Sequence, residues 1–190
     1  NTSIINASNI FDTQLNRTAG FVATNLGTVA YSYVKGFEKN ILSTKTTTNS
    51  TTNGTECVIY ASGAGSVAGF VFLNAGTIHD CYTNTICKSN SAGVAGFVYD
   101  TVNGSVYQCY SASKVESGNT NTALATELPF VGVGLEKDNA QELLSSKDML
   151  NCYYYDDGTE YDMNYVLNSD AVEPKGLSLE SFTNYNNLNN

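Results

Sequence analysis

Hydrophobic residues recur in the same order in three stretches of the chain. Each stretch begins with Gly-Phe-Val, crosses a polar turn containing Asn and Gly, and ends with a second apolar run that closes on Tyr. The two runs are rich in β-branched and aromatic residues, which indicates a strand, a turn and a second strand. Self-similarity of this kind is typical of stacked-repeat proteins. The stretches are GFVATNLGTVAYSY (20–33), GFVFLNAGTIHDCY (69–82) and GFVYDTVNGSVYQCY (96–110).

The spacing of these stretches predicts an all-β fold of the parallel β-helix type, a β-solenoid with a right-handed sense. Gly69 and Gly96 are 27 positions apart, which suits one coil whose strands pair in parallel with those of the next coil. An antiparallel sandwich is the competing fold, but it requires neither equal coils nor cysteines at equivalent positions. We therefore expect like residues to lie about 4.8 Å apart along a common axis.

Residues at equivalent repeat positions are expected to form columns, with apolar columns filling a shared core. Turn positions need a tolerant backbone, which the Asn and Gly residues between the two runs supply. The expected structural columns are Phe21, Phe70 and Phe97; Val29, Ile78 and Val106; and Cys81, Cys109 and Cys152, with Ser32 at the first position of the cysteine column.

The chain is predicted to be one β-solenoid domain over 1–190. Clear coils are expected near 19–36, 57–84 and 86–113, and a degenerate coil with a cap over 127–190. Gly20 to Gly69 spans 49 positions, 22 more than the repeat, and the excess predicts a loop insertion at about 37–56. Its Thr/Asn-rich part, 43–55, has no apolar residue whose burial would offset the entropy of ordering. A short helix near the C-terminal end is predicted from Asp138, a suitable N-cap, to Met149.

The repeats resemble the GLUG-motif family, whose units read approximately G-G-L-V-G-x-N-x-G-x-I-x-N-C-Y-A. The matching residues run from Ala68 to Tyr82, flanked by copies from Ala19 to Tyr33 and from Ala95 to Tyr110. The tail NCYYYDDGTEYD followed by KGLSLESF is similar to the segment that ends such repeats. The resemblance implies a bacterial extracellular or surface-attached protein, adhesin-like in some members, without catalytic residues in the repeats.

Composition adds limits on partners and localisation. The 18 acidic and 9 basic residues give a net charge of −9, which argues against nucleic acid and against an anionic membrane surface. No apolar run approaches the roughly 18 residues of a membrane span. Plentiful Asn, Thr, Ser, Gly and Tyr without any Trp is typical of secreted, loop-rich β proteins. We therefore expect an extracellular or cell-surface protein with no membrane span in this segment.

The five cysteines admit more than one interpretation. Those of the predicted column are expected to be buried free thiols rather than bonded pairs. Cys57 and Cys87 lie outside it, each shortly before a Gly-Phe-Val segment, and are the candidates for one disulfide. A zinc site is disfavoured because the chain has one His and no close Cys-x-x-Cys pair.

Acidic residues near Gly158 are a weak candidate for a calcium site. Hard cations prefer several oxygen ligands on a flexible loop, but the spacing differs from that of an EF-hand, and a solvated turn explains the group more simply. The same carboxylates would suit a glycosidase pair, except that Arg17 is the only arginine and no Ser-His-Asp set is present. We expect no cofactor other than possible calcium. The candidate residues are Asp156, Asp157, Glu160 and Asp162.

Tyrosines are the remaining candidates for recognition. Tyr suits strands for structural reasons, but an exposed set would also bind sugars or protein. The possible contact face comprises Tyr31, Tyr60, Tyr99, Tyr107, Tyr154 and Tyr155.

Three functions follow from these expectations. The leading hypothesis is a non-enzymatic stalk or adhesin-like module whose partner is a protein or glycan on a host or neighbouring cell. The second is a filament subunit whose own copies stack end to end through open coil edges. The third, weaker, is a carbohydrate-active β-helix enzyme.

Overall fold

Parallel strands stacked in sheets make up the described part of the molecule. The computed structural model describes residues 4–7, 17–35, 58–61, 65–90, 93–102, 104–118, 127–132, 149–159, 174–178 and 181. Within these ranges the chain is all-β, and only Ser181 is helical, which confirms the all-β and parallel parts of the prediction. The arrangement is compatible with the predicted β-helix.

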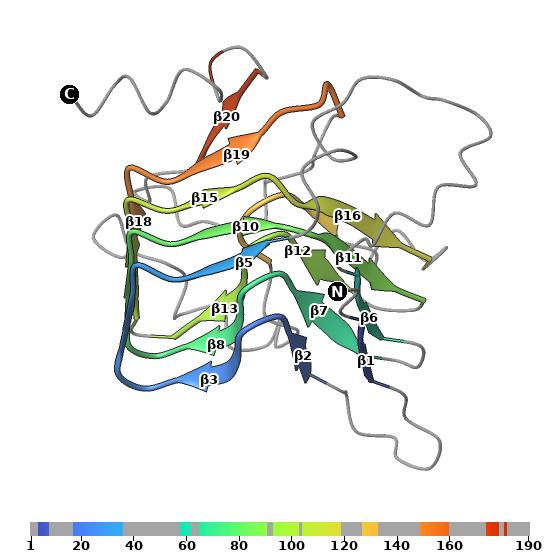
Figure 1. Cartoon of the computed structure of the whole chain (residues 1–190), viewed down its shortest axis with the longest axis horizontal. Helices are drawn as coiled ribbons and strands as arrows, with labels where there is room; N and C mark the ends of the chain where they lie inside the picture. The colour runs from blue at the N-terminus through green and yellow to red at the C-terminus, as the bar shows by residue number, and fades with distance from the viewer. Residues whose placement is uncertain are drawn as a thin grey trace.

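The chain passes through five sheets in the same order again and again, and we call each pass a winding (Figure 1). The first winding contains β1 (Ile4–Ala7), β2 (Arg17–Ala19), β3 (Val22–Asn25), β4 (Thr28–Ala30) and β5 (Tyr33–Lys35). The second contains β6 (Val58–Ala61), β7 (Ser66–Ala68), β8 (Val71–Asn74), β9 (Thr77–His79) and β10 (Tyr82–Asn84). The third contains β11 (Ile86–Ser89), β12 (Val94–Ala95), β13 (Val98–Thr101), β14 (Ser105–Tyr107) and β15 (Tyr110–Ser111). The fourth contains β16 (Lys114–Ser117), β17 (Glu127–Leu128), β18 (Met149–Leu150) and β19 (Tyr153–Tyr155), and β20 (Lys175–Leu177) follows it.

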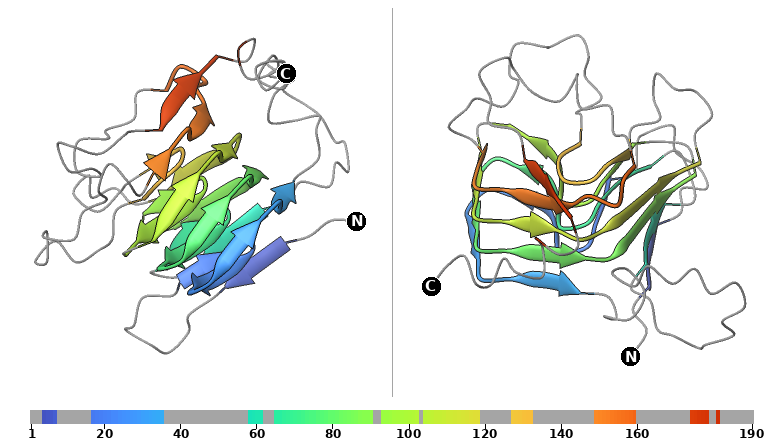
Figure 2. Two further views of the ribbon diagram at one scale, coloured as in Figure 1. Left: turned by 90° about the vertical axis from the view of Figure 1, so that its left-hand side faces the viewer. Right: turned by 90° about the horizontal axis from the view of Figure 1, so that it is seen from above.

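Strands of successive windings lie one above another and pair in parallel (Figure 2). We name the sheets A to E in the order in which a winding visits them. The register places equivalent residues opposite each other, as in the pairing of Val29 with Ile78 and of Ile78 with Val106. In the fourth winding an isolated bridge between Val98 and Val131 takes the place of a strand in sheet C. The sheets are β1-β6-β11-β16 (A), β2-β7-β12-β17 (B), β3-β8-β13 (C), β4-β9-β14-β18 (D) and β5-β10-β15-β19-β20 (E).

The phenylalanines of the Gly-Phe-Val segments stack in one column inside the molecule. Phe70 lies between Phe21 and Phe97, with ring centroids 4.9 Å from each, and Phe97 stacks on Phe130 at 4.8 Å. These separations match the distance between neighbouring strands of a sheet, so the column follows directly from the register. Phe130 continues the column although Pro129 precedes it where the other copies have Gly.

The Asn-x-Gly turns between sheets C and D are held by side-chain amides. Asn25 donates a hydrogen bond from Nδ2 to Oδ1 of Asn74, at 2.8 Å, which links two windings. Within each winding the Asn Oδ1 accepts from the glycine N–H two residues later, at 3.1 Å for Gly27 and 3.3 Å for Gly76. The buried amides are therefore satisfied by the turn that they stabilise.

The buried hydrophobic side chains of the described residues form three clusters. Phe70, Ile78 and their equivalents form the largest cluster, inside sheets C, D and E. A second lies between sheets A and B around Ile59 and Cys87. A third, around Phe72 and Tyr99, lies on the opposite side of sheet C from the first.

The bend between sheets B and C corrects one sequence-based expectation. Tyr99 was predicted to belong to a possible aromatic contact face. Instead it is 2% exposed, stacks on Phe72 at 4.6 Å, and accepts a hydrogen bond of 3.1 Å from Ser66 in sheet B. The side of sheet C that faces away from the main core, where Tyr99 lies, is therefore covered by sheet B.

Two predicted features fall largely or wholly outside the described residues. The short helix was expected over 138–149, of which only Met149 is described, and it lies in strand β18. The polar loop insertion at about 37–56 lies outside the described ranges and stays a prediction.

Candidate functional site: the corner between sheets D and E

Each winding turns from sheet D into sheet E through one residue in the left-handed backbone region. These residues have φ between 51° and 53°, and none is a glycine. L-residues adopt this region at a steric cost, so its recurrence shows that the surrounding ladders fix the bend. The bend brings an inward polar column and two outward aromatic columns together at one corner. The four residues are Tyr31, Asp80, Gln108 and Asn151.

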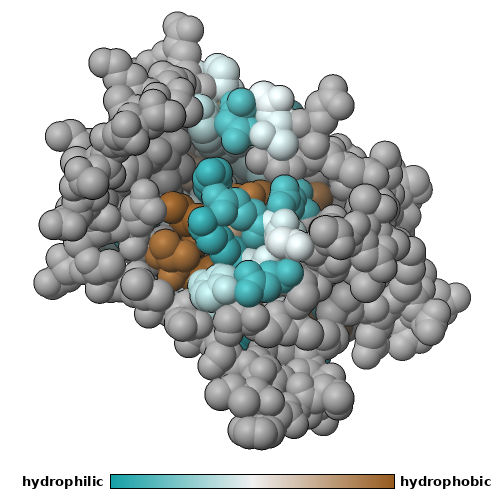
Figure 3. Space-filling model, turned by 90° about the vertical axis from the view of Figure 1, so that its right-hand side faces the viewer, coloured by the Kyte–Doolittle hydropathy of each residue, from teal (hydrophilic) through white to brown (hydrophobic). Residues whose placement is uncertain are grey.

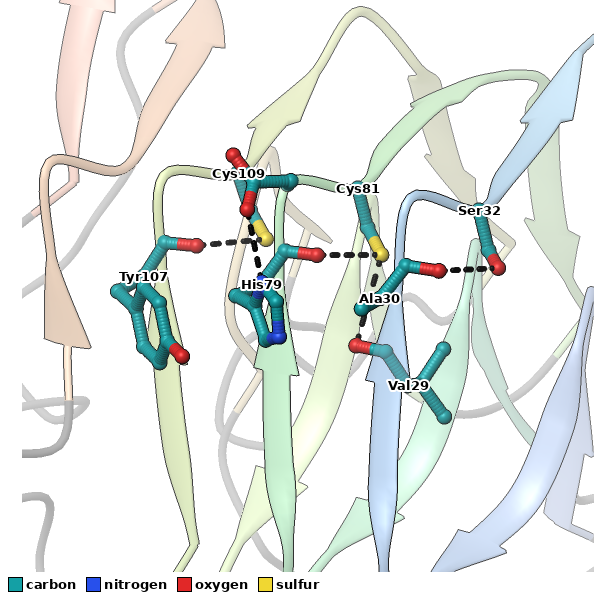
Figure 4. A network of polar contacts seen from close by, with 8 residues as sticks. Val29, Ala30, Ser32, His79, Cys81, Tyr107 and Cys109 are labelled. Carbon is teal, nitrogen blue, oxygen red and sulfur yellow. Dashed lines mark hydrogen bonds and ion pairs between the residues drawn. The ribbon is translucent and has the colours of Figure 1, made fainter.

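The residue after each bend lies in one column, in which Figure 4 shows Ser32, Cys81 and Cys109, and Cys152 has the equivalent position in the fourth winding. Each side chain donates to the carbonyl oxygen two residues earlier in its own winding. The donor–acceptor distance is 2.9 Å for Ser32, 3.0 Å for Cys81, 3.2 Å for Cys109 and 3.5 Å for Cys152. The three cysteines are free thiols and are buried.

Stacking gives the three thiols different acidities. The neighbouring Cys109 side chain, through a hydrogen bond between the two sulfurs, lowers the pKa of Cys81 to about 7, against the opposing effect of burial. Burial raises the pKa of Cys109 far above that of a free thiol. Burial also raises the pKa of Cys152, to about 12. The three cysteines are each at most 3% exposed. Their thiols therefore pack in the core and are not accessible as nucleophiles.

An aromatic column lies on the outer side of sheet D at this corner. The His79 ring stacks on Tyr107 at 4.9 Å and is met edge-on by Tyr31 at 5.5 Å. His79 Nδ1 also lies 2.7 Å from Asp80 Oδ2, so the carboxylate at the bend orients the imidazole. Leu150, exposed, takes the equivalent position in the fourth winding.

A second outward column runs along sheet E. Tyr82 stacks on Tyr33 and on Tyr110, with ring centroids 4.9 Å apart in each pair and planes within 6° of parallel. Tyr153 occupies the same register position in the fourth winding. These rings are half-exposed, except that of Tyr33, which is exposed. We call Tyr33, Tyr82, Tyr110 and Tyr153 the tyrosine wall.

The tyrosine wall was not part of the contact face predicted from the sequence. Three of its residues, Tyr33, Tyr82 and Tyr110, close the repeated stretches of the sequence, and strand alternation from the inward Cys81 to Tyr82 was the signal that would have placed them outside.

Of the predicted contact residues, Tyr31 and Tyr107 lie in the column beside the tyrosine wall, and Tyr155 is half-buried two residues after Tyr153. Tyr154 alternates with Tyr153 and packs against the core, while Tyr60 lies on sheet A.

Sheet A presents a different wall, which carries the charged residues Lys88, Lys114 and Glu116. Hydrophilic residues gather at the centre of this face, with hydrophobic residues beside them (Figure 3). Lys88 and Lys114 approach the two carboxylate oxygens of Glu116 at 2.6 and 2.8 Å. Partial burial opposes ionisation of Glu116, but the hydrogen bonds from the two lysines outweigh it and lower its pKa. The pairs are exposed enough that they add little stability.

The acidic candidates do not converge in the described residues. Asp156 Oδ1 accepts from the Gly158 N–H and Asp157 Oδ1 from the Thr159 N–H, both at 2.9 Å, which are local turn contacts. Glu160 and Asp162 lie outside the described ranges. Among the described residues no group of three or more His, Cys, Asp or Glu side chains is arranged to hold a metal ion.

Only Cys87 of the predicted Cys57–Cys87 disulfide lies among the described residues. Cys87 is buried in the cluster between sheets A and B, with its Sγ 3.4 Å from the Thr85 hydroxyl. Cys57 lies outside the described residues, so the disulfide stays a prediction.

None of the helices that the described residues form is long and apolar enough to cross a membrane. Comparison with known protein families, with curated proteins and with solved structures found no match. The resemblance to the GLUG-motif repeats therefore rests on the residues quoted above.

Proposed function

We propose that this chain is a right-handed β-solenoid segment of an extracellular or cell-surface protein and that it acts as a non-enzymatic, adhesin-like contact module. The proposal is supported by the in-register windings, by the resemblance of the repeats to the GLUG motif, and by the composition. A solenoid of this kind is stiff along its axis, so side chains on its walls are held in fixed positions before a partner arrives.

The tyrosine wall is the observation that carries the proposal. Tyr33, Tyr82 and Tyr110 face outward from adjacent strands with parallel rings at intervals of 4.9 Å. Tyrosine is a favoured contact residue because it buries a large, rigid surface at a small cost in side-chain entropy. Stacking within the column lowers that cost further, since the rings are already ordered.

The geometry of the wall favours a glycan over an apolar partner. Tyr82 has both ring faces occupied, by Tyr33 and by Tyr110, so a partner that approaches from the side of the molecule meets its ring edge and hydroxyl group. Repeated polar groups at a regular spacing suit a polymer that itself repeats hydroxyl groups, as an extended polysaccharide does. We therefore assign this wall a role in holding a surface glycan.

Binding to an array of immobilised polysaccharides, followed by kinetics on the hits, tests the proposal. We expect the wild-type chain to bind at least one polysaccharide. The double variant Tyr82→Leu/Tyr110→Leu, which keeps apolar bulk on the wall, should bind at least tenfold more weakly. Tyr60→Leu, on sheet A, is the matched control and should bind normally. Absence of binding to any glycan, equal loss in the control, or release of shortened sugar from the bound polymer would each overturn the assignment.

A further inference from the structure

Four residues at the corner between sheets D and E hold a strained backbone conformation, and contacts within the chain account for the side chains of only two of them. Their φ values lie between 51° and 53°, where a glycine would carry no steric cost. Tyr31 meets the His79 ring edge-on at 5.5 Å, and the Asp80 carboxylate lies 2.7 Å from His79 Nδ1. Gln108 and Asn151 are exposed, and their side chains form no hydrogen bond with the other described residues.

Gln108 is the side chain that the fold accounts for least. Asn and Asp tolerate the left-handed region because their short polar side chains bond locally, whereas a glutamine there is unusual. The bond that holds the bend runs from the Gln108 backbone N–H to the Leu150 carbonyl oxygen, at 2.9 Å, and a glycine would make it equally well. Strained residues without a structural reason are typical of sites that hold a ligand. The amide of Gln108 is therefore a candidate for contact with a partner.

The bend residues lie between two aromatic columns. On one side the rings of His79 and Tyr107 stack at 4.9 Å, on neighbouring strands of sheet D (Figure 4). On the other side the tyrosine wall repeats at the same interval along sheet E. Because the strands on both sides pair in register, equivalent bend residues lie one winding apart, at about 4.8 Å. We call Asp80, Gln108 and Asn151 the polar ridge.

The chemistry of the polar ridge suits a neutral sugar polymer. Its amides donate and accept hydrogen bonds and its carboxylate accepts them, which matches the mixed donor and acceptor character of sugar hydroxyl groups. The Asp80 carboxylate and the net charge of −9 oppose binding of an anionic polysaccharide. An extended chain of β-1,4-linked hexoses advances per sugar by a distance close to the rise between windings, so successive sugars meet equivalent residues of successive windings.

Given the proposed function of the tyrosine wall, on which this step rests, we infer that the polar ridge determines which glycan is bound. The ligand is a neutral, extended β-1,4-linked polysaccharide that lies across the windings, with one sugar per winding. The ridge amides and carboxylate bond to sugar hydroxyl groups, and the flanking ring edges keep water from these bonds. Because paired strands hold the polar groups in position before the sugar arrives, less entropy is lost on binding.

Calorimetric titration with neutral β-1,4-linked oligosaccharides of two, three and four sugars tests the polar ridge. We expect affinity to rise with each added sugar and to exceed that for an oligomer of the same linkage that carries carboxylates. Gln108→Gly removes the amide and relieves the bend. It should bind about three- to tenfold more weakly, the range for one neutral hydrogen bond, while its stability to unfolding does not fall.

Two further variants separate the amide from general effects of substitution. Gln108→Asn keeps an amide in a residue type suited to the bend, so it should bind more tightly than the glycine variant. Lys114→Ala changes an exposed residue on sheet A and should bind as wild type does.

Equal binding by Gln108→Gly and wild type, equal weakening by Lys114→Ala, a constant affinity along the oligosaccharide series, or tighter binding of the charged oligomer would each overturn the role of the polar ridge. If Tyr82→Leu/Tyr110→Leu weakens glycan binding while Gln108→Gly does not, the proposed function holds and the ridge does not select the glycan. A wild-type chain that binds no polysaccharide overturns both.

Discussion

At the scale of single residues, four non-glycine residues adopt a backbone conformation that L-amino acids disfavour. The bend between sheets D and E is built by four consecutive windings with Tyr, Asp, Gln and Asn in the left-handed region, where glycine would be free of steric cost. Asp and Asn tolerate this region better than Gln or Tyr, so the cost differs between windings. The backbone bond from Gln108 N–H to the Leu150 carbonyl, at 2.9 Å, is one of the contacts that hold the bend.

Substitution at Gln108 measures that cost. Gln108→Gly removes the steric penalty but makes the unfolded chain more flexible, so we expect a gain of about 0.5 kcal/mol in the free energy of unfolding. Gln108→Val introduces a β-branched residue at φ 53° and should lose about 1 to 2 kcal/mol. Urea denaturation of the three proteins compares them, and a Val variant as stable as wild type would show that the bend is not left-handed.

The buried thiol of Cys152 makes stability depend on alkaline pH. Its pKa is raised to about 12 by burial, whereas in the unfolded chain the thiol ionises near its ordinary value. The stabilisation is therefore fully present below about pH 8 and is lost as the pH rises, because only the unfolded state releases the proton.

Between pH 8 and 10 this loss amounts to about 1 to 2 kcal/mol for the one thiol. The variant Cys152→Ser has no thiol and so does not show this loss of stability. Ser32, at the equivalent position of the first winding, shows that the column accepts a serine. Urea denaturation under reducing conditions should thus show a smaller decrease for the serine variant than for wild type over this interval. Equal decreases would mean that Cys152 ionises in the folded protein.

At the scale of elements, close approach between windings explains which turn residues are replaceable. Gly27 and Gly76 occupy equivalent turns, but a Cβ on Gly76 would fall 2.1 Å from the Gly27 carbonyl oxygen, and one on Gly27 would contact nothing. The requirement for glycine therefore comes from the neighbouring winding and not from the turn itself. It is absent at Gly27, where a Cβ would meet nothing within 4 Å.

The two glycines should respond differently to alanine. Gly76→Ala forces two windings apart and is expected to cost about 1 to 3 kcal/mol, the range for overpacking. Gly27→Ala is expected to change stability by less than about 0.5 kcal/mol. Thermal or urea unfolding of the two variants and the wild type provides the comparison. Similar losses for both variants would contradict the packing described here.

The sequence predicted the elements that repeat and missed those that depend on contacts between different sheets. Gly-Phe-Val and the Cys-Tyr pair recur at equivalent positions, and a spacing of 27 residues was enough to predict parallel strands. The burial of Tyr99 was not predictable from alternation, because it depends on sheet B bending over the outer side of sheet C. The His79–Asp80 contact and the left-handed bend leave no repeated residue type that would have indicated them.

At the scale of the whole molecule, the windings give the chain walls with distinct chemistry. Sheet E carries the tyrosine wall, sheet A carries the Lys88–Glu116–Lys114 group, and the first winding carries the exposed apolar residues. From the sequence alone, function could be taken only as far as the hypothesis of a surface protein with aromatic contacts. Strand alternation from the inward Cys81 to Tyr82 would have placed the contact wall, but alternation does not show which outward side chains a neighbouring sheet covers, as sheet B covers Tyr99.

Methyl nuclear Overhauser contacts test the central claim of in-register windings most directly. Val29, Ile78, Val106 and Met149 come from four windings and stand in one column of sheet D. In a sample with labelled methyl groups at low concentration, we predict strong contacts between Val29 and Ile78, between Ile78 and Val106, and between Val106 and Met149. We predict none between Val29 and Met149. A missing link in this series, or a direct contact between its two ends, would contradict the account.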